Sequence, residues 1–74
     1  MKLTGADCRI ARRCRGVTLR AVAPYLGVTP QRVGQIERKA RVTPEEYNRF
    51  SGAVEAAYAE KIRREYAALE EEAE

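Results

Sequence analysis

The residues best suited to specific chemistry are the amides and guanidiniums between Pro30 and Lys39. Gln31 and Gln35 are four residues apart, and Arg32 lies between them. At about 3.6 residues per turn, a helix would place both amides on one side. A glutamine amide donates and accepts in a fork that matches the major-groove edge of adenine, and a guanidinium does the same for guanine. The spacing therefore indicates a helix that reads base edges, with a merely solvated helix face as the alternative.

Two short helices joined by a glycine turn are expected to carry these side chains. Thr18 can cap a helix from about Leu19 to Tyr25, and Gly27 would end it in the left-handed conformation. Thr29 can cap the next helix, from about Pro30 to Lys39, with proline in the favoured first position. This pattern predicts a helix-turn-helix over residues 18–39.

A third helix is expected before this pair. Thr4 and Asp7 form a capping box for a helix over residues 5–15. Cys8 and Cys14 are six residues apart in it, so they point to different sides and cannot bridge without breaking the helix. We expect both to be reduced and partly buried, as in a cytoplasmic protein.

A long helix is expected to follow the pair. Thr43 and Glu46 form a second capping box, and helical spacing of apolar residues continues almost to the end of the sequence. Ser51–Gly52 is the point where this helix could break or kink. The fold class is thus all-α, a small bundle of four to five helices with a long C-terminal helix. Its later apolar residues extend past what a small domain can cover, which favours homodimerisation through Tyr58, Ile62, Tyr66 and Leu69.

Charge is distributed unequally along the 74 residues. Through Thr43 there are ten basic residues against two acidic ones, and from Pro44 onward four basic residues against nine acidic ones. A basic front half is typical of proteins that bind a polyanion, and the acidic half should face away from that partner. Histidine is absent, which argues against an enzyme, and no cysteine spacing suits a metal. We expect no cofactor, no metal and no membrane span.

The chain resembles the helix-turn-helix family of lambdoid phage repressors and Cro proteins, the XRE or Cro/CI type. The resemblance covers about residues 8–54 and is carried by R-G-V-T-L-R-A-V-A followed by L-G-V-T-P-Q-R-V-G-Q-I-E-R. It implies a lambda repressor-like DNA-binding domain and a transcriptional regulator, expected to be a dimeric repressor. Such a dimer would bind double-stranded DNA at a palindromic operator with residues 30–39 in the major groove, its half-sites about one helical turn apart.

The resemblance also suggests roles for single residues. Base contacts fall on Gln31, Arg32 and Gln35, and Arg12 with Glu37 matches a partly buried ion pair. Leu19 and Pro30 depart from the family, because glutamines often stand at these two positions. From their charge or capping position, the residues expected to contact phosphate are Arg20, Thr29, Arg38, Lys39 and Arg41.

Two other interpretations compete with this one. The stretch from Val28 to Ala40 also resembles the recognition helix of the promoter −35-binding region of sigma factors, although Arg41-Val42-Thr43-Pro44 interrupts it. Alternatively, the long helix could make the chain a protein-interaction module, such as an antitoxin or adaptor. The expected division is a DNA-binding domain over residues 1–57 and a helical dimerisation segment over residues 58–74.

Overall fold

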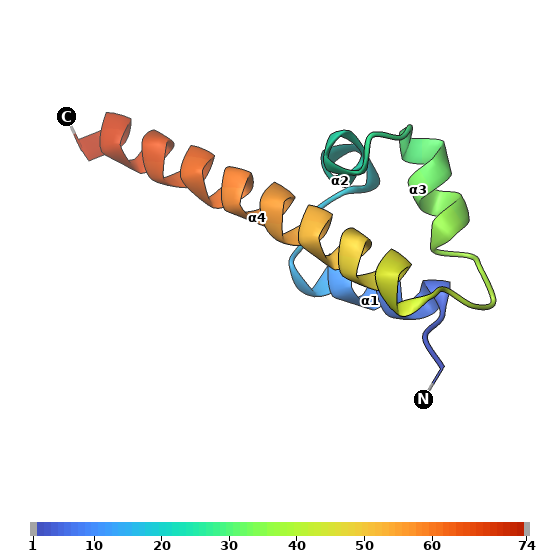
Figure 1. Cartoon of the computed structure of the whole chain (residues 1–74). Helices are drawn as coiled ribbons and strands as arrows, with labels where there is room; N and C mark the ends of the chain where they lie inside the picture. The colour runs from blue at the N-terminus through green and yellow to red at the C-terminus, as the bar shows by residue number, and fades with distance from the viewer. Residues whose placement is uncertain (1, 74) are drawn as a thin grey trace.

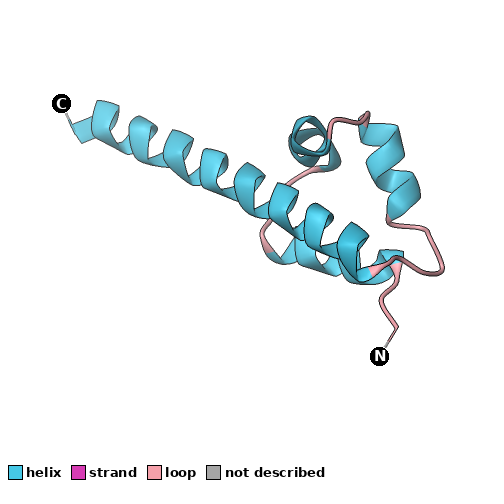
Figure 2. Ribbon diagram, viewed as in Figure 1, coloured by secondary structure: helices cyan, strands magenta, loops and turns pink. Residues whose placement is uncertain are grey.

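The computed structural model describes residues 2–73 and is all-α over that range. Its four helices are α1 (Gly5–Cys14), α2 (Leu19–Leu26), α3 (Pro30–Ile36) and α4 (Pro44–Ala73). The first three gather around the beginning of α4, and the rest of α4 extends well beyond them (Figure 1). Short loops make every connection (Figure 2), and the molecule measures 49 × 25 × 16 Å.

Threonine hydroxyls begin all four helices, as the sequence predicts. Thr18 Oγ1 accepts from the Ala21 amide at 3.1 Å, and Thr29 Oγ1 accepts from the Arg32 amide at 3.2 Å. The reciprocal capping boxes predicted at α1 and α4 are both present. Gly27 ends α2 with φ 69°, in the left-handed region that glycine enters at little cost. These local signals are sufficient to place the helix starts.

The core lies where α1, α2 and α3 meet the first half of α4. Phe50 is 1% exposed and is the largest of the fully buried side chains. The other buried apolar residues come from all four helices and their connections: Cys8, Val17, Val22, Ala23, Val33, Val42, Ala53, Val54 and Ala57. The core is therefore shared by the predicted helix pair and the helices that flank it.

Helix α3 is shorter than the sequence predicts. It ends at Ile36 and not near Lys39, with Glu37 as its C-cap. Beyond it the amides of Arg38 and Lys39 make tight i−3 turns, and the Lys39 carbonyl accepts from the Gly5 amide at 2.9 Å. This hydrogen bond to the start of α1 ties the chain to that helix at Lys39, so α3 does not continue to this residue.

Helix α4 is unbroken, so the predicted weak point at Ser51–Gly52 is not a break. Phe50, Ala53 and Val54 on either side of Gly52 are buried in the core, while Gly52 itself is exposed. Packing on both sides fixes the helical path, and the low helix propensity of glycine is outweighed.

The two cysteines differ, and the expectation that both are partly buried is wrong. Cys8 is fully buried, whereas Cys14 is exposed on α1, opposite the core. Burial and the neighbouring carboxylates of Glu37 and Asp7 raise the pKa of Cys8 from 9.0 to about 11. Its thiol stays protonated near neutral pH and serves as a small apolar side chain.

Candidate nucleic-acid interface

The outward side of α3 presents polar side chains only. Gln31, Arg32, Gln35 and Arg38 are exposed, while Val33 on the opposite side is fully buried. At about 100° per residue, Gln31 and Gln35 lie about 40° apart with Arg32 at one edge of the exposed arc, and Arg38 follows just beyond the C-terminal end of α3. Arg32 Nη1 donates to Gln35 Oε1 at 3.2 Å, so the predicted base-contacting residues lie side by side.

Helix α2 contributes to the same surface through its first residue. Leu19 borders a shallow hollow whose remaining lining comes from α3 and its cap: Pro30, Gln31, Gly34, Gln35 and Arg38. A Cβ at Gly34 would lie 3.8 Å from Leu19 Cδ1, an ordinary contact, so no close backbone approach within the chain requires glycine there. The amides thus flank an open depression, and nothing from the domain covers them.

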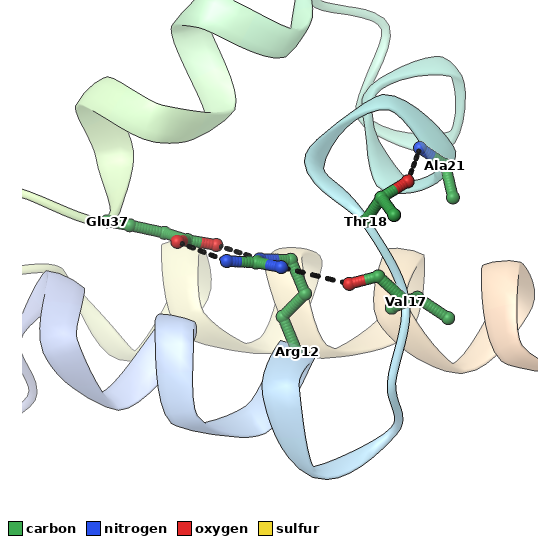
Figure 3. Close-up of polar contacts among 5 residues, drawn as sticks. All are labelled: Arg12, Val17, Thr18, Ala21 and Glu37. Atoms are coloured by element: carbon green, nitrogen blue, oxygen red, sulfur yellow. Dashed lines mark hydrogen bonds and ion pairs between the residues drawn. The ribbon is translucent and has the colours of Figure 1, made fainter.

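An ion pair fixes the end of α3 to α1. Arg12 Nε lies 2.6 Å from Glu37 Oε2, and Arg12 Nη2 lies 3.0 Å from Glu37 Oε1, in a two-pronged contact. Arg12 Nη1 also donates to the Val17 carbonyl at 2.9 Å (Figure 3). The two side chains are only 13% and 6% exposed, so the pair that the resemblance suggests forms in the structure and is largely buried. This contact links the C-terminal end of α3 to α1 and to the chain just before α2.

The residues expected to contact phosphate do not all gather on one surface. Arg38 lies beside the glutamines, but Arg20 borders a different hollow between α2 and α4, and Arg41 lies beside Lys2 in the connection between α3 and α4. Thr29 is exposed, and its oxygen accepts the capping hydrogen bond, which leaves its hydroxyl proton free to donate.

Lys39 is already paired within the domain. Its Nζ lies 2.6 Å from Glu46 Oε2, so a phosphate would have to compete with that carboxylate. The Lys39 ammonium and the Thr43 amide lower the pKa of Glu46 from 4.5 to about 2. Acidic residues of the second half, Glu46 beside Lys39 and Glu55 beside Arg15, therefore neutralise part of the basic half.

The Lys39–Glu46 contact predicts a dependence of stability on pH. Because the folded-state pKa of Glu46 is lowered, the stabilisation is complete above pH 4.5 and is lost as the pH falls toward 2. The free energy of unfolding, measured with urea, should differ between the wild type and Glu46→Gln most at neutral pH. This difference in unfolding free energy should shrink as the pH falls from 4.5 toward 2. In a Lys39→Met background, the same substitution should show a smaller change with pH. A difference that is constant with pH would contradict the assigned contact.

Arg49 is a basic residue that the sequence analysis missed. It borders the hollow between α3 and α4 that also contains Arg32, over a floor of apolar residues: Leu26, Val28, Ile36 and Phe50. Arg49 belongs to the second half of the chain, where acidic residues outnumber basic ones. Arg49 lies one turn after Glu46, near the start of the helix that follows the exposed arc. This position in the sequence is the signal that could have predicted a basic side chain beside the arc.

The predicted dimerisation residues share one side of α4. Tyr58, Ile62, Tyr66 and Leu69 border a shallow hollow together with Glu65. Tyr58 is half-buried because the Arg15 guanidinium stacks 4.7 Å from its ring centre, whereas Tyr66 and Leu69 are 65% and 58% exposed. Contacts with the domain extend beyond Ala57, since Lys61 Nζ donates to the Gly16 carbonyl at 3.0 Å.

Comparison with known proteins found no matching family model, and no curated protein or solved structure matched the chain. Within residues 2–73, no helix has the length and apolar character needed to cross a membrane. The same residues contain no cluster of three or more side chains suited to hold a metal ion.

Proposed function

We propose that the chain is a sequence-specific DNA-binding regulator of transcription. Helices α2 and α3 act as a helix-turn-helix, and α3 enters the major groove with Gln31 and Gln35 toward base edges. Arg32 stands at one edge of the arc and Arg38 just beyond the end of α3, each beside a wall of the groove. A palindromic operator would be read by two copies that pair through the far part of α4.

The observation that carries this proposal is the exposed arc of α3. Its two central glutamines are uncovered and flanked by arginines, and buried contacts hold the helix rigidly on its other side. Rigid presentation matters because a base contact discriminates only if its donor and acceptor are held in position. The arc lacks exposed large apolar side chains, unlike the anchor of a protein-binding surface.

Basic side chains near both ends of α3 favour contacts with the phosphates beside the groove. Arg38 carries its charge at the end of the arc, and Arg49 adds a second charge next to Arg32. Phosphate contacts of this kind fix register and orientation without reading sequence. The two central amides are thus assigned to base recognition, and the arginines at the edges of the arc are assigned to phosphate contacts that position α3 on the DNA.

Replacing Gln35 with alanine is expected to relax specificity at one base position. Sites selected from random duplex DNA by the wild-type protein would be compared with their single-base variants, using wild type and Gln35→Ala. The loss of a two-pronged amide contact should reduce discrimination at that base by about 1–3 kcal/mol and leave other positions unchanged. Binding constants from fluorescence anisotropy at fixed salt measure it.

Two variants serve as controls for this measurement. Arg38→Ala should weaken all sequences alike and make binding less dependent on salt, because a phosphate contact releases counterions. Asn48→Ala removes an exposed amide from α4 and should change neither quantity. If Gln35→Ala retained the full base preference of the wild type, the assigned orientation of α3 would be wrong. A chain that self-associates but binds no duplex would favour an interaction module instead.

A further inference from the structure

The apolar strip on the far part of α4 points away from the domain that carries it. We define the strip as Tyr58, Ile62, Tyr66 and Leu69. At about 100° per residue, its mean direction is rotated by roughly 120° from that of Phe50, Ala53, Val54 and Ala57, which pack into the core. Tyr58 packs against the core and Arg15, and Ile62 is half-buried, whereas Tyr66 and Leu69 are exposed on the part of the unbroken helix α4 that extends beyond the domain. The described residues therefore leave the far part of the strip uncovered.

Basic residues border the beginning of the strip and acidic residues border its end. Lys61 and Arg63 flank the beginning, with Arg64 on the opposite side of α4, Glu65 borders the middle, and Glu70 and Glu72 flank the end. The only acid that the basic group holds within the described chain is Glu60, which Arg63 and Arg64 contact at 2.7 and 3.1 Å. Carboxylates in the last turns of a helix oppose its dipole, and α4 has no basic residue in its last turn. A partner for the strip should therefore bring acids to its beginning and bases to its end.

A second copy of the same helix meets this requirement if it runs in the opposite direction. We propose that two α4 helices pair antiparallel through the strip. In one register, Arg63 faces Glu70 of the second copy along one edge, and Lys61 faces Glu72 along the other. Arg63 and Glu70 lie only about 20° apart around the helix, so they share one edge of the strip, and Lys61 and Glu72 share the other edge in the same way. A two-fold axis places each edge of one copy against the same edge of the second copy. Parallel pairing in register would instead bring Glu70 of each copy near Glu72 of the other, which sets four carboxylates along the interface.

The apolar side chains interleave in the same register. Ile62 of each copy lies beside Leu69 of the other, and the two Tyr66 rings meet at the two-fold axis. Arg15, stacked on Tyr58, closes the strip on the side of the domain. The overlap is about 15 residues, or roughly 22 Å. So short an overlap buries less than a standard interface of about 1,600 Å², so the pairing should be weak and sensitive to salt.

This geometry, which rests on the dimer of the proposed function, also sets the distance between the two copies of α3. Arg32 on α3 shares a hollow with Glu46 and Arg49, which marks the level of α3 along α4. That level is about 19 residues from the two-fold axis, so the two α3 helices are separated by at least about 55 Å along α4. One turn of DNA spans about 34–36 Å. Half-sites are therefore expected more than one turn apart, and not at the one-turn spacing expected from the sequence.

A charge-exchange experiment on the full chain tests the pairing without DNA. Arg63→Glu and Glu70→Arg should each weaken the dimer about tenfold in sedimentation equilibrium at low ionic strength, because the symmetric interface contains each contact twice. The double variant R63E/E70R should recover wild-type association, since it only exchanges the two charges. Circular dichroism checks that α4 stays helical. Arg64→Glu is the matched control, because this residue lies on the opposite side of α4 from the strip.

The outcomes separate this inference from DNA binding. If the double variant were as weak as the singles, or if Arg64→Glu weakened the dimer as much as Arg63→Glu, the antiparallel register would be wrong. A wild-type chain that remained monomeric up to about 1 mM would overturn the pairing itself, while the base preference of α3 would still be tested by Gln35→Ala. A dimer that shows charge exchange but binds no DNA would support the pairing and remove the proposed function.

Discussion

Replacing Glu37 with alanine is expected to destabilise the domain by about 3–5 kcal/mol, because it leaves a buried guanidinium without its counter-ion. Arg12 is 13% exposed and would keep only the Val17 carbonyl as a partner. A chain of this size has a total stability on the order of 4–11 kcal/mol. Much of the protein should therefore be unfolded at 37 °C, as urea titration followed by circular dichroism would measure. A loss below about 1 kcal/mol is the value typical of an exposed pair and would contradict the buried geometry.

The double variant R12M/E37L is the matched control for this prediction. Removing both charges avoids the desolvation cost of each, so its stability should lie close to that of the wild type, less the hydrogen bond to Val17. The same variant tests what the Arg12–Glu37 ion pair contributes to DNA recognition. If the domain stays folded but its preferred DNA site changes, the ion pair orients α3; if the site is unchanged, packing of Val33 alone is sufficient.

Local chemistry made the helix starts predictable from the sequence. A threonine hydroxyl caps the amide three residues later whatever the surroundings, and proline at the first position adds to the signal. Left-handed glycine is equally local, and both Gly16 and Gly27 adopt positive φ where the first two helices end. The exposed polar arc of α3 could also be predicted, because helical period alone sets Gln31 and Gln35 apart from Val33.

Contacts between distant segments account for what the sequence did not predict. The end of α3 depends on the hydrogen bond between the Gly5 amide and the Lys39 carbonyl, which links residues far apart in the chain. The continuity of α4 depends on core packing at Phe50 and Ala53. Pairing of Lys39 with Glu46 removes a charge expected at the phosphates. Such contacts require the packed arrangement of helices, which no pattern along a single helix contains.

Among the five glycines, Gly5 has the least room for a side chain, where the first turn of α1 meets the end of α3. A Cβ built at this position would lie 2.6 Å from the Glu37 carbonyl carbon and 2.7 Å from its oxygen, and still nearer to the Ile36 carbonyl oxygen. These are backbone atoms, so no side chain can rotate to make room. Glycine is needed here for space and not for its φ, so no local turn signal in the sequence marks this position.

Gly5→Ala should consequently destabilise the domain by about 3 kcal/mol, at the upper end of what overpacking costs. The two segments must separate, which strains the Gly5–Lys39 hydrogen bond and shifts Glu37 relative to Arg12. Gly52→Ala provides the opposite result within the same chain. Nothing lies within 4 Å of its added Cβ, and replacing an exposed helical glycine should stabilise by about 1 kcal/mol. Equal effects of both substitutions on the urea midpoint would show that α1 does not approach α3 this closely. The orientation proposed for the exposed arc would then lose its support, because it depends on that approach together with the ion pair.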